Sequence, residues 1–307
     1  MRPRPLALAL LATALLFACP AAAQDKPATA PPAAEDNGEI VVTGREVRDD
    51  QVRDFVSGLT GNIGSDPLPR FVDAELCPVS LGLTPAFDAA ITTRLRRVAM
   101  AANIRVAREG CRANALVIFA ADKDATIRAL RKGYPQLFYQ PTGAPVRLRD
   151  KKEPVTSWVI SDFVDSEGVA VPIDTETGQY VLESSGSVSR LTNPMRPIYR
   201  MSVLVIEIAA VEGLTITQIA DYAAMRAFTG ANPDRVRNAG VPTILTIVEA
   251  PIGSEIPNSM TAWDLGFLRG LYAAPPNLRA PAQRGRIARD LKQGTNAGSE
   301  TGDRPAP

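Results

Sequence analysis

The chain of 307 residues contains no histidine. This absence excludes Ser-His-Asp and Cys-His catalysis, histidine general bases and every metal site that needs imidazole. The sequence also lacks the G-x-x-x-x-G-K-[ST] and G-x-G-x-x-G phosphate-binding loops and the G-x-S-x-G nucleophile elbow. Catalysis by paired carboxylates stays open, because Asp and Glu can act as acid and base without histidine.

Cysteine is scarce, with three residues in the whole chain. Cys77 and Cys111 predict a disulfide, which would close a loop of about 34 residues and stabilise the fold by about 3 to 4 kcal/mol. The alternative is two separate buried thiols. No Cys-x-x-Cys pair is present, so a redox role is not indicated. We expect neither a metal nor another cofactor.

No hydrophobic run reaches the roughly 20 residues that a membrane-spanning helix needs. The apolar run Leu6–Phe17 follows two arginines and precedes Ala21–Ala23, which is the plan of a secretory signal. We therefore expect residues 1–23 to be removed and the mature chain to be periplasmic or secreted, without a transmembrane segment. The alternative is a lipoprotein, because Leu16–Cys19 resembles a lipobox that would leave Cys19 lipidated.

The formal net charge is +1, and it becomes −1 when the two signal-peptide arginines are removed. A nearly neutral chain is not expected to bind nucleic acid or acidic lipid. Residues 24–38 and the end of the segment 276–307 are rich in Ala, Pro, Gly and charge, so we expect a disordered linker and a disordered tail. Between them, residues 39–275 are predicted to form one domain.

The spacing of apolar residues predicts an alternation of helices and strands. Helices are expected at 49–59, 84–102, 122–132, 214–228, 261–272 and, as an amphipathic segment, 283–291. Strands are expected at 104–107, 115–120, 155–164 and 200–209, with a hairpin at 174–178 and a short apolar element at 243–248. The fold class is therefore α/β (α+β), with a mixed sheet, a long N-terminal helix and two C-terminal helices. The run at 115–120 is nearly all apolar, which favours a central strand.

Glu207 and Asp221 are the weak candidates for carboxylate catalysis. Glu207 interrupts an apolar strand, and a buried carboxylate there must be paired, hydrogen-bonded or shifted in pKa. The alternatives are that strand alternation turns Glu207 to solvent, and that Asp221 is a polar helix edge beside a core Tyr222.

Other chemistry-bearing residues have simpler interpretations. Trp158 and Trp263 are interpreted as core residues; the alternative is an exposed aromatic side chain that binds sugar. Arg94, Arg96 and Arg97 are interpreted as the solvated face of their helix, because the apolar positions follow another face. The alternative is that these arginines form a binding patch.

The order of elements across residues 200–272 resembles the catalytic half of a zincin, specifically the matrixin-like metzincins. In those enzymes a helix with H-E-x-x-H-x-x-G-x-x-H is followed by a turn containing Met and then by a helix capped by Thr-x-x-Asp that ends in Leu-Tyr. The corresponding segments here are Gln218–Phe228, Pro242–Val248 and Met260–Asp264 with Leu271–Tyr272. The N-terminal half, a long helix followed by strands, fits the same plan.

The residues that make a metzincin an enzyme are missing from this chain. In the most natural register the zinc histidines fall on Gln218, Tyr222 and Phe228, and the general-base Glu falls on Ile219. The run 242–248 contains no Met. Zinc catalysis needs three protein ligands and an activated water, so the resemblance implies a zincin-like domain that does not use zinc.

The stretch Glu39–Gly44 resembles the TonB box of TonB-dependent outer-membrane receptors. Its β-prone core suits docking by strand addition; it consists of Glu39, Ile40, Val41, Val42 and Thr43. Those receptors need a barrel of about 22 strands, which this chain of short strands and helices cannot supply. Two interpretations remain: a strand that docks on an envelope protein, or an edge strand of the domain's own sheet.

Two functions follow from the sequence. The first is an exported, non-catalytic zincin-like envelope protein with a binding or structural role. The second is a metal-independent envelope hydrolase in which Glu207 and Asp221 converge in an open cleft, with carboxyl groups about 5 to 10 Å apart.

Overall fold

The computed structural model describes residues 48–61, 66–72, 74–149, 153–182, 192–251 and 253–301. The expected signal peptide, the linker and the segment Glu39–Thr43 lie outside the described residues. The elements below all belong to one compact unit of the chain, which spans Gly38–Pro307.

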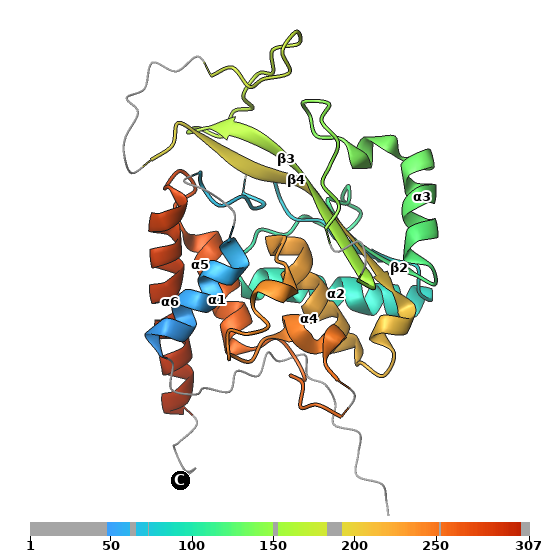
Figure 1. The fold of residues 1–307 in the computed structure, drawn as a ribbon, viewed down its shortest axis with the longest axis vertical. Helices are drawn as coiled ribbons and strands as arrows, with labels where there is room; N and C mark the ends of the chain where they lie inside the picture. The colour runs from blue at the N-terminus through green and yellow to red at the C-terminus, as the bar shows by residue number, and fades with distance from the viewer. Residues whose placement is uncertain are drawn as a thin grey trace, which may run out of the picture. The chain divides into compact units, whose positions relative to one another are not determined.

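Four strands form a mixed sheet in the order β1-β2-β4-β3 (Figure 1). Strands β1 (Pro78–Leu81), β2 (Ala115–Ala120) and β4 (Met195–Glu207) run parallel, and β3 (Val155–Asp165) pairs antiparallel with β4. This confirms the expected α/β class and mixed sheet. It also confirms the central position of β2, which lies between β1 and β4.

Helices cover both faces of the sheet. Along β4, Val203 and Val205 contact the core beneath α3 (Lys123–Gly133) and the 3-10 helix η1 (Pro135–Phe138). Side chains that alternate with them face a larger core, which includes α2 (Pro85–Ala101) and α4 (Ile216–Thr229). Figure 1 shows α3 on one side of the strands and α2 and α4 on the other. A strand buried on both faces reads as a continuous apolar run, as β4 does.

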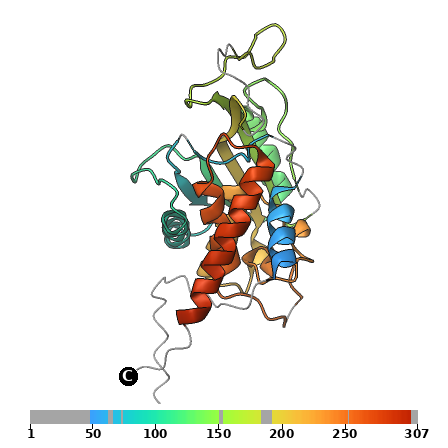
Figure 2. The same cartoon turned by 90° about the vertical axis from the view of Figure 1, so that its left-hand side faces the viewer.

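Helices α1 (Asp49–Thr60), α5 (Ala262–Ala273) and α6 (Ala280–Thr301) complete the larger core. Figure 2 shows α1 beside α6. A Cβ at Gly270 of α5 would lie 3.0 Å from the Cα of Ile287 of α6, so these helices approach closely. The amphipathic segment expected at 283–291 is therefore part of a longer helix, α6, which packs against α5.

Three further 3-10 helices follow the last strand: η2 (Ile208–Val211), η3 (Pro233–Arg235) and η4 (Ile244–Glu249). The expected strand at 104–107 is reduced to an isolated bridge between Leu76 and Val106. The expected hairpin at 174–178 is confirmed by an antiparallel bridge between Ile173 and Tyr180.

Cys77 and Cys111 form a disulfide, as predicted, with a sequence separation of 34 residues. The bond ties the residue before β1 to the loop that leads into β2. The Asn114 side chain reinforces the same junction by accepting a hydrogen bond from the Cys77 amide at 2.7 Å. Within the described ranges, none of the helices is both long and apolar enough to span a membrane.

Candidate functional site

The central helix α4 carries Asp221, one of the two predicted carboxylate candidates, and has well-defined ends. Thr215 accepts a hydrogen bond from the Gln218 amide while the Gln218 side chain accepts one from the Thr215 amide, which is a capping box. Gly230 ends the helix with φ 63°, a left-handed conformation that favours glycine. A Cβ at Gly230 would lie 2.8 Å from the Tyr199 hydroxyl, so space also demands glycine.

Every residue of α4 from Gln218 to Thr229 is buried. A polar side chain buried in this way must find partners inside the protein, because an unsatisfied polar group costs free energy. The contacts of Asp221, Tyr222 and Arg226 therefore decide what this helix can do chemically.

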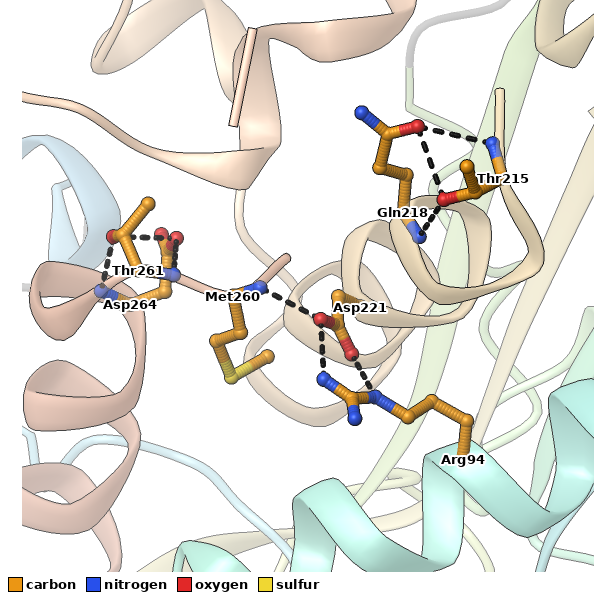
Figure 3. Close-up of polar contacts among 7 residues, drawn as sticks. All are labelled: Arg94, Thr215, Gln218, Asp221, Met260, Thr261 and Asp264. Atoms are coloured by element: carbon orange, nitrogen blue, oxygen red, sulfur yellow. Dashed lines mark hydrogen bonds and ion pairs between the residues drawn. The ribbon is translucent and has the colours of Figure 1, made fainter. Parts of the chain in front are cut away.

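Asp221 is held by an ion pair with Arg94 of α2 (Figure 3). The Arg94 Nε donates to Oδ1 at 2.8 Å and Nη2 donates to Oδ2 at 2.9 Å. The backbone amide of Met260, just before α5, donates to the same Oδ2 at 2.6 Å. Asp221 therefore joins three separate parts of the chain, and its side chain has no exposed area.

These contacts correct two interpretations of the sequence. Arg94 is buried instead of lying on a solvated face, whereas Arg97 on the same helix is exposed. Asp221 is not a polar helix edge, nor is it open to a cleft as a catalytic carboxylate would be. Glu207 is half-buried where β4 ends, and its amide donates to the Pro154 carbonyl at 2.9 Å.

Arg226 forms a second buried polar contact, between α4 and β3. Its Nη1 donates to the Tyr222 hydroxyl at 2.7 Å and its Nη2 donates to the Ser157 hydroxyl at 3.1 Å. The guanidinium carbon lies 5.6 Å from the centre of the Tyr222 ring, within cation–π range. Tyr222 is therefore a core aromatic, as one sequence interpretation held, and its hydroxyl is used by the helix itself.

The other positions of interest on α4 serve packing. The Gln218 amide nitrogen donates to the Pro257 carbonyl at 2.9 Å, while its oxygen completes the cap. Phe228 and Ile219 belong to the large core.

No group of three or more Asp, Glu, His or Cys side chains within the described ranges could hold a metal ion. Trp158 and Trp263 are core residues, as expected.

A second buried carboxyl group, that of Asp264, organises the start of α5 (Figure 3). It accepts hydrogen bonds from the Thr261 amide and hydroxyl, the Ile244 amide and the Thr243 hydroxyl. Burial raises the pKa of the Asp264 carboxyl group, and these four donors oppose that rise. The expected Thr261 and Asp264 capping box is confirmed.

The last two carbonyls of α4, those of Phe228 and Thr229, each receive a donor from elsewhere in the chain. Tyr272 donates to the Phe228 carbonyl at 2.9 Å, and Tyr199 donates to the Thr229 carbonyl at 3.1 Å. Burial raises the pKa of the Tyr199 hydroxyl to about 12, so it stays a donor at neutral pH. These bonds satisfy carbonyls that a helix end leaves without partners.

Sequence reasoning missed Arg94, Met260 and Arg226. Arg94 did carry a signal, because it shares the face of α2 formed by Ile91, Leu95 and Val98, which are all buried. Met260 precedes the Thr261 cap directly, but no sequence pattern indicates that its backbone amide binds Asp221.

Comparison of the chain with models of protein families, with curated proteins and with solved structures gives no match.

Proposed function

We propose that this chain is an exported, non-catalytic domain of zincin-like plan that binds a partner. The observation that carries the proposal is the coordination of Asp221. Both of its oxygens are occupied by donors from the fold itself, Arg94 and the Met260 amide, and the side chain is closed to solvent. The carboxylate at the centre of the helix thus stabilises the arrangement of elements instead of facing a substrate.

The zincin-like plan is supported by the order of the elements and by the Thr261 cap of α5. A long helix, α2, precedes the main strands, and β4 is followed by α4 and then by the Thr261-capped helix α5. Met260 stands directly before that cap, and its amide binds α4.

The residues at the zinc positions do not fit a metal. The Gln218 side chain is used by the cap and by Pro257, the Tyr222 hydroxyl accepts from Arg226, and Phe228 has no donor atom. A catalytic zinc site needs three nitrogen, sulfur or oxygen ligands and an open position. We therefore assign no step of chemistry to a metal.

Export is supported by the signal-like N-terminus and by the disulfide. Disulfides persist in oxidising compartments, which fits a periplasmic or secreted protein. The lipidated form at Cys19 is the alternative mode of export. Mass spectrometry of the protein purified from an envelope fraction distinguishes a chain starting near Gln24 from one starting at acylated Cys19.

The geometry does not favour the alternative, a carboxylate-based hydrolase. That mechanism needs two carboxyl groups facing a common substrate, and Asp221 has no exposed surface. The purified chain should show no turnover of peptide, ester or glycoside substrates. Turnover that disappears in Glu207→Gln or Asp221→Asn, with the fold retained, would overturn the non-catalytic assignment.

Strand addition by residues 39–44 remains one way in which the proposed partner could bind. Partners are captured from envelope extracts with the full mature chain and with a variant that lacks residues 39–44. Loss of a specific partner, with unchanged thermal unfolding, supports docking by this segment. Loss of the fold instead assigns the segment to the domain's own sheet.

A further inference from the structure

A groove of about 380 Å³ runs between α1 and α6. The two helices are antiparallel: Asp49 at the start of α1 pairs with Lys292, and Thr60 at its end accepts from Arg284. The volume falls in the range of ligand pockets, about 300 to 1,000 Å³.

The floor of the groove is apolar and its edges are cationic. Val52 and Val56 of α1 and Ala288 of α6 line it together with Gly285. A Cβ at Gly285 would meet no atom of the described residues within 4 Å, so they leave the space above it open. Among the described residues that line the groove, the charged ones are one acid, Asp49, and four bases: Arg53, Arg284, Arg289 and Lys292.

This excess of positive charge is local, because the whole chain has a formal net charge of only +1. Two of the four bases, Arg284 and Lys292, are engaged with α1. Arg53 and Arg289 are exposed, one on each helix of the groove. They can therefore approach an anionic partner without first breaking the contacts that hold α1 against α6.

We propose that this groove binds an acidic amphipathic helix of a partner protein. The proposal rests on the binding role proposed above and names the chemistry of the partner. A third helix can lay an apolar stripe along the seam of two antiparallel helices, with anchors at positions i, i+3 or i+4, and i+7. Glutamate or aspartate on the flanks of that stripe meets Arg53 and Arg289, and arginine binds carboxylates in a bidentate manner.

The lining residues fit this partner better than two other anions. Single-stranded nucleic acid is usually bound by a cationic track with aromatic side chains for base stacking, and none of the described residues that line the groove is aromatic. An anionic membrane surface is bound best by an apolar face that projects from the protein, whereas Val52 and Val56 are buried at the bottom of a groove.

The direct test is the binding of a labelled synthetic helix to the full mature chain, followed by fluorescence anisotropy. The probe has a leucine stripe over three turns and glutamates on both flanks, and the control peptide replaces each glutamate with lysine. We expect the acidic peptide alone to bind, with an affinity that falls as salt rises. Equal binding of both peptides, or binding of neither, would overturn the proposal.

Substitutions of residues that line the groove test whether the acidic peptide binds there. The double variant Arg53→Glu with Arg289→Glu should weaken binding at least tenfold, and Gly285→Leu should do the same by filling the open space. Arg286→Glu is the matched control, because Arg286 is exposed on α6 but does not line the groove, and it should stay within twofold of the wild type. Equal affinities of wild type and double variant would place the peptide elsewhere and overturn the proposal. Circular dichroism confirms that each variant is folded.

Two competing occupants give different results. Tight binding to vesicles containing phosphatidylglycerol, lost in the double variant while the peptide does not bind, would assign the groove to lipid. A dimer in sedimentation that Arg289→Glu dissociates, again without peptide binding, would assign it to a second copy of this chain. Either result overturns the helix proposal. Hydrolysis abolished by Asp221→Asn would instead overturn the non-catalytic function and leave a positive peptide result standing.

Discussion

Arg94 and Asp221 are joined by two parallel hydrogen bonds, 2.8 and 2.9 Å long, although 127 residues separate them in the sequence. The pair links α2 to α4, and the Met260 amide links both to the start of α5. A buried ion pair contributes little net stability in itself, because desolvation of both charges offsets their attraction. Its contribution here is geometric, because it joins a residue of α2 to a residue of α4 inside the core.

Asp221→Asn should lower the free energy of unfolding by about 3 to 5 kcal/mol, because it leaves the buried Arg94 charge without this carboxylate. Urea unfolding followed by circular dichroism measures the loss. Arg97→Met is the control, since Arg97 is exposed on the same helix, and its effect should stay within about 0.5 kcal/mol. An Asp221→Asn protein as stable as the Arg97→Met protein would contradict the structural role.

The double variant Arg94→Met with Asp221→Leu should be more stable than predicted by adding the losses of unfolding free energy measured for the two single variants. It removes both buried charges together, so neither is left uncompensated. It should still be less stable than the wild type, because the Met260 amide loses its acceptor and an unsatisfied buried amide costs about 1 to 3 kcal/mol. Simple additivity in this cycle would show that the two residues do not interact.

Local signals were enough to predict most helices and strands. Thr215 and Thr261 cap their helices with side chains that belong to the same turn, and the apolar run of β2 fixes its central place. The partner of Asp221 could not be predicted in this way, because the position of Arg94 on the apolar face of α2 indicates burial but not which residue it meets. Burial of one arginine among three depends on a helix encoded far away in the chain.

Helix α6 is a second feature that the local sequence pattern did not predict. Its periodic part predicted only an amphipathic segment outside the domain, whereas Ile287 and Leu291 are fully buried. Gly266 and Gly270 of α5 allow α6 to approach, so the contact depends on glycines in another helix. A pattern read along one segment does not reveal such complementarity.

Replacing both Cys77 and Cys111 by serine should lower the free energy of unfolding by about 3 to 4 kcal/mol, the cost expected for opening a loop of 34 residues. Reducing the wild type should produce a similar loss. The serine variant is its own control, because a reductant should leave its unfolding curve unchanged. A wild type that is insensitive to complete reduction, verified by thiol titration, would contradict the prediction.

Gly230→Ala should lower the free energy of unfolding by roughly 1 to 3 kcal/mol, because the residue has φ 63° and its Cβ would crowd the Tyr199 hydroxyl. Gly133→Ala is the control: it ends α3, and its Cβ would meet no atom within 4 Å. Tyr199→Phe should lower the unfolding free energy less in the Gly230→Ala background than in the wild type. In that background, removing the hydroxyl also relieves its contact with the added Cβ. Equal costs in the two backgrounds would show that the hydroxyl does not cause the crowding.

The difference in unfolding free energy between the wild type and Asp264→Asn should depend on pH, because the buried Asp264 carboxyl group titrates. Burial raises the folded pKa of Asp264 above its unfolded value, near 3.9. Between the two pKa values the folded state binds more protons, so the contribution of Asp264 to stability is fully present below the unfolded pKa and is lost as pH rises through the folded pKa. Asparagine does not titrate. The wild type should therefore exceed the variant in unfolding free energy by more at pH 4 than at pH 8.

Urea unfolding at several pH values between 4 and 8 measures this difference. Thr215→Val is the matched control, because it removes the capping threonine of α4, whose partner Gln218 carries no charge. It should cost about 1 kcal/mol, a loss that stays level across the same pH range. Thr261→Val removes the cap of α5 and one donor to Asp264, so its cost should grow with pH as the ionised carboxyl loses support. If the Thr261→Val loss were as level as the Thr215→Val loss, Asp264 would not be the group that titrates.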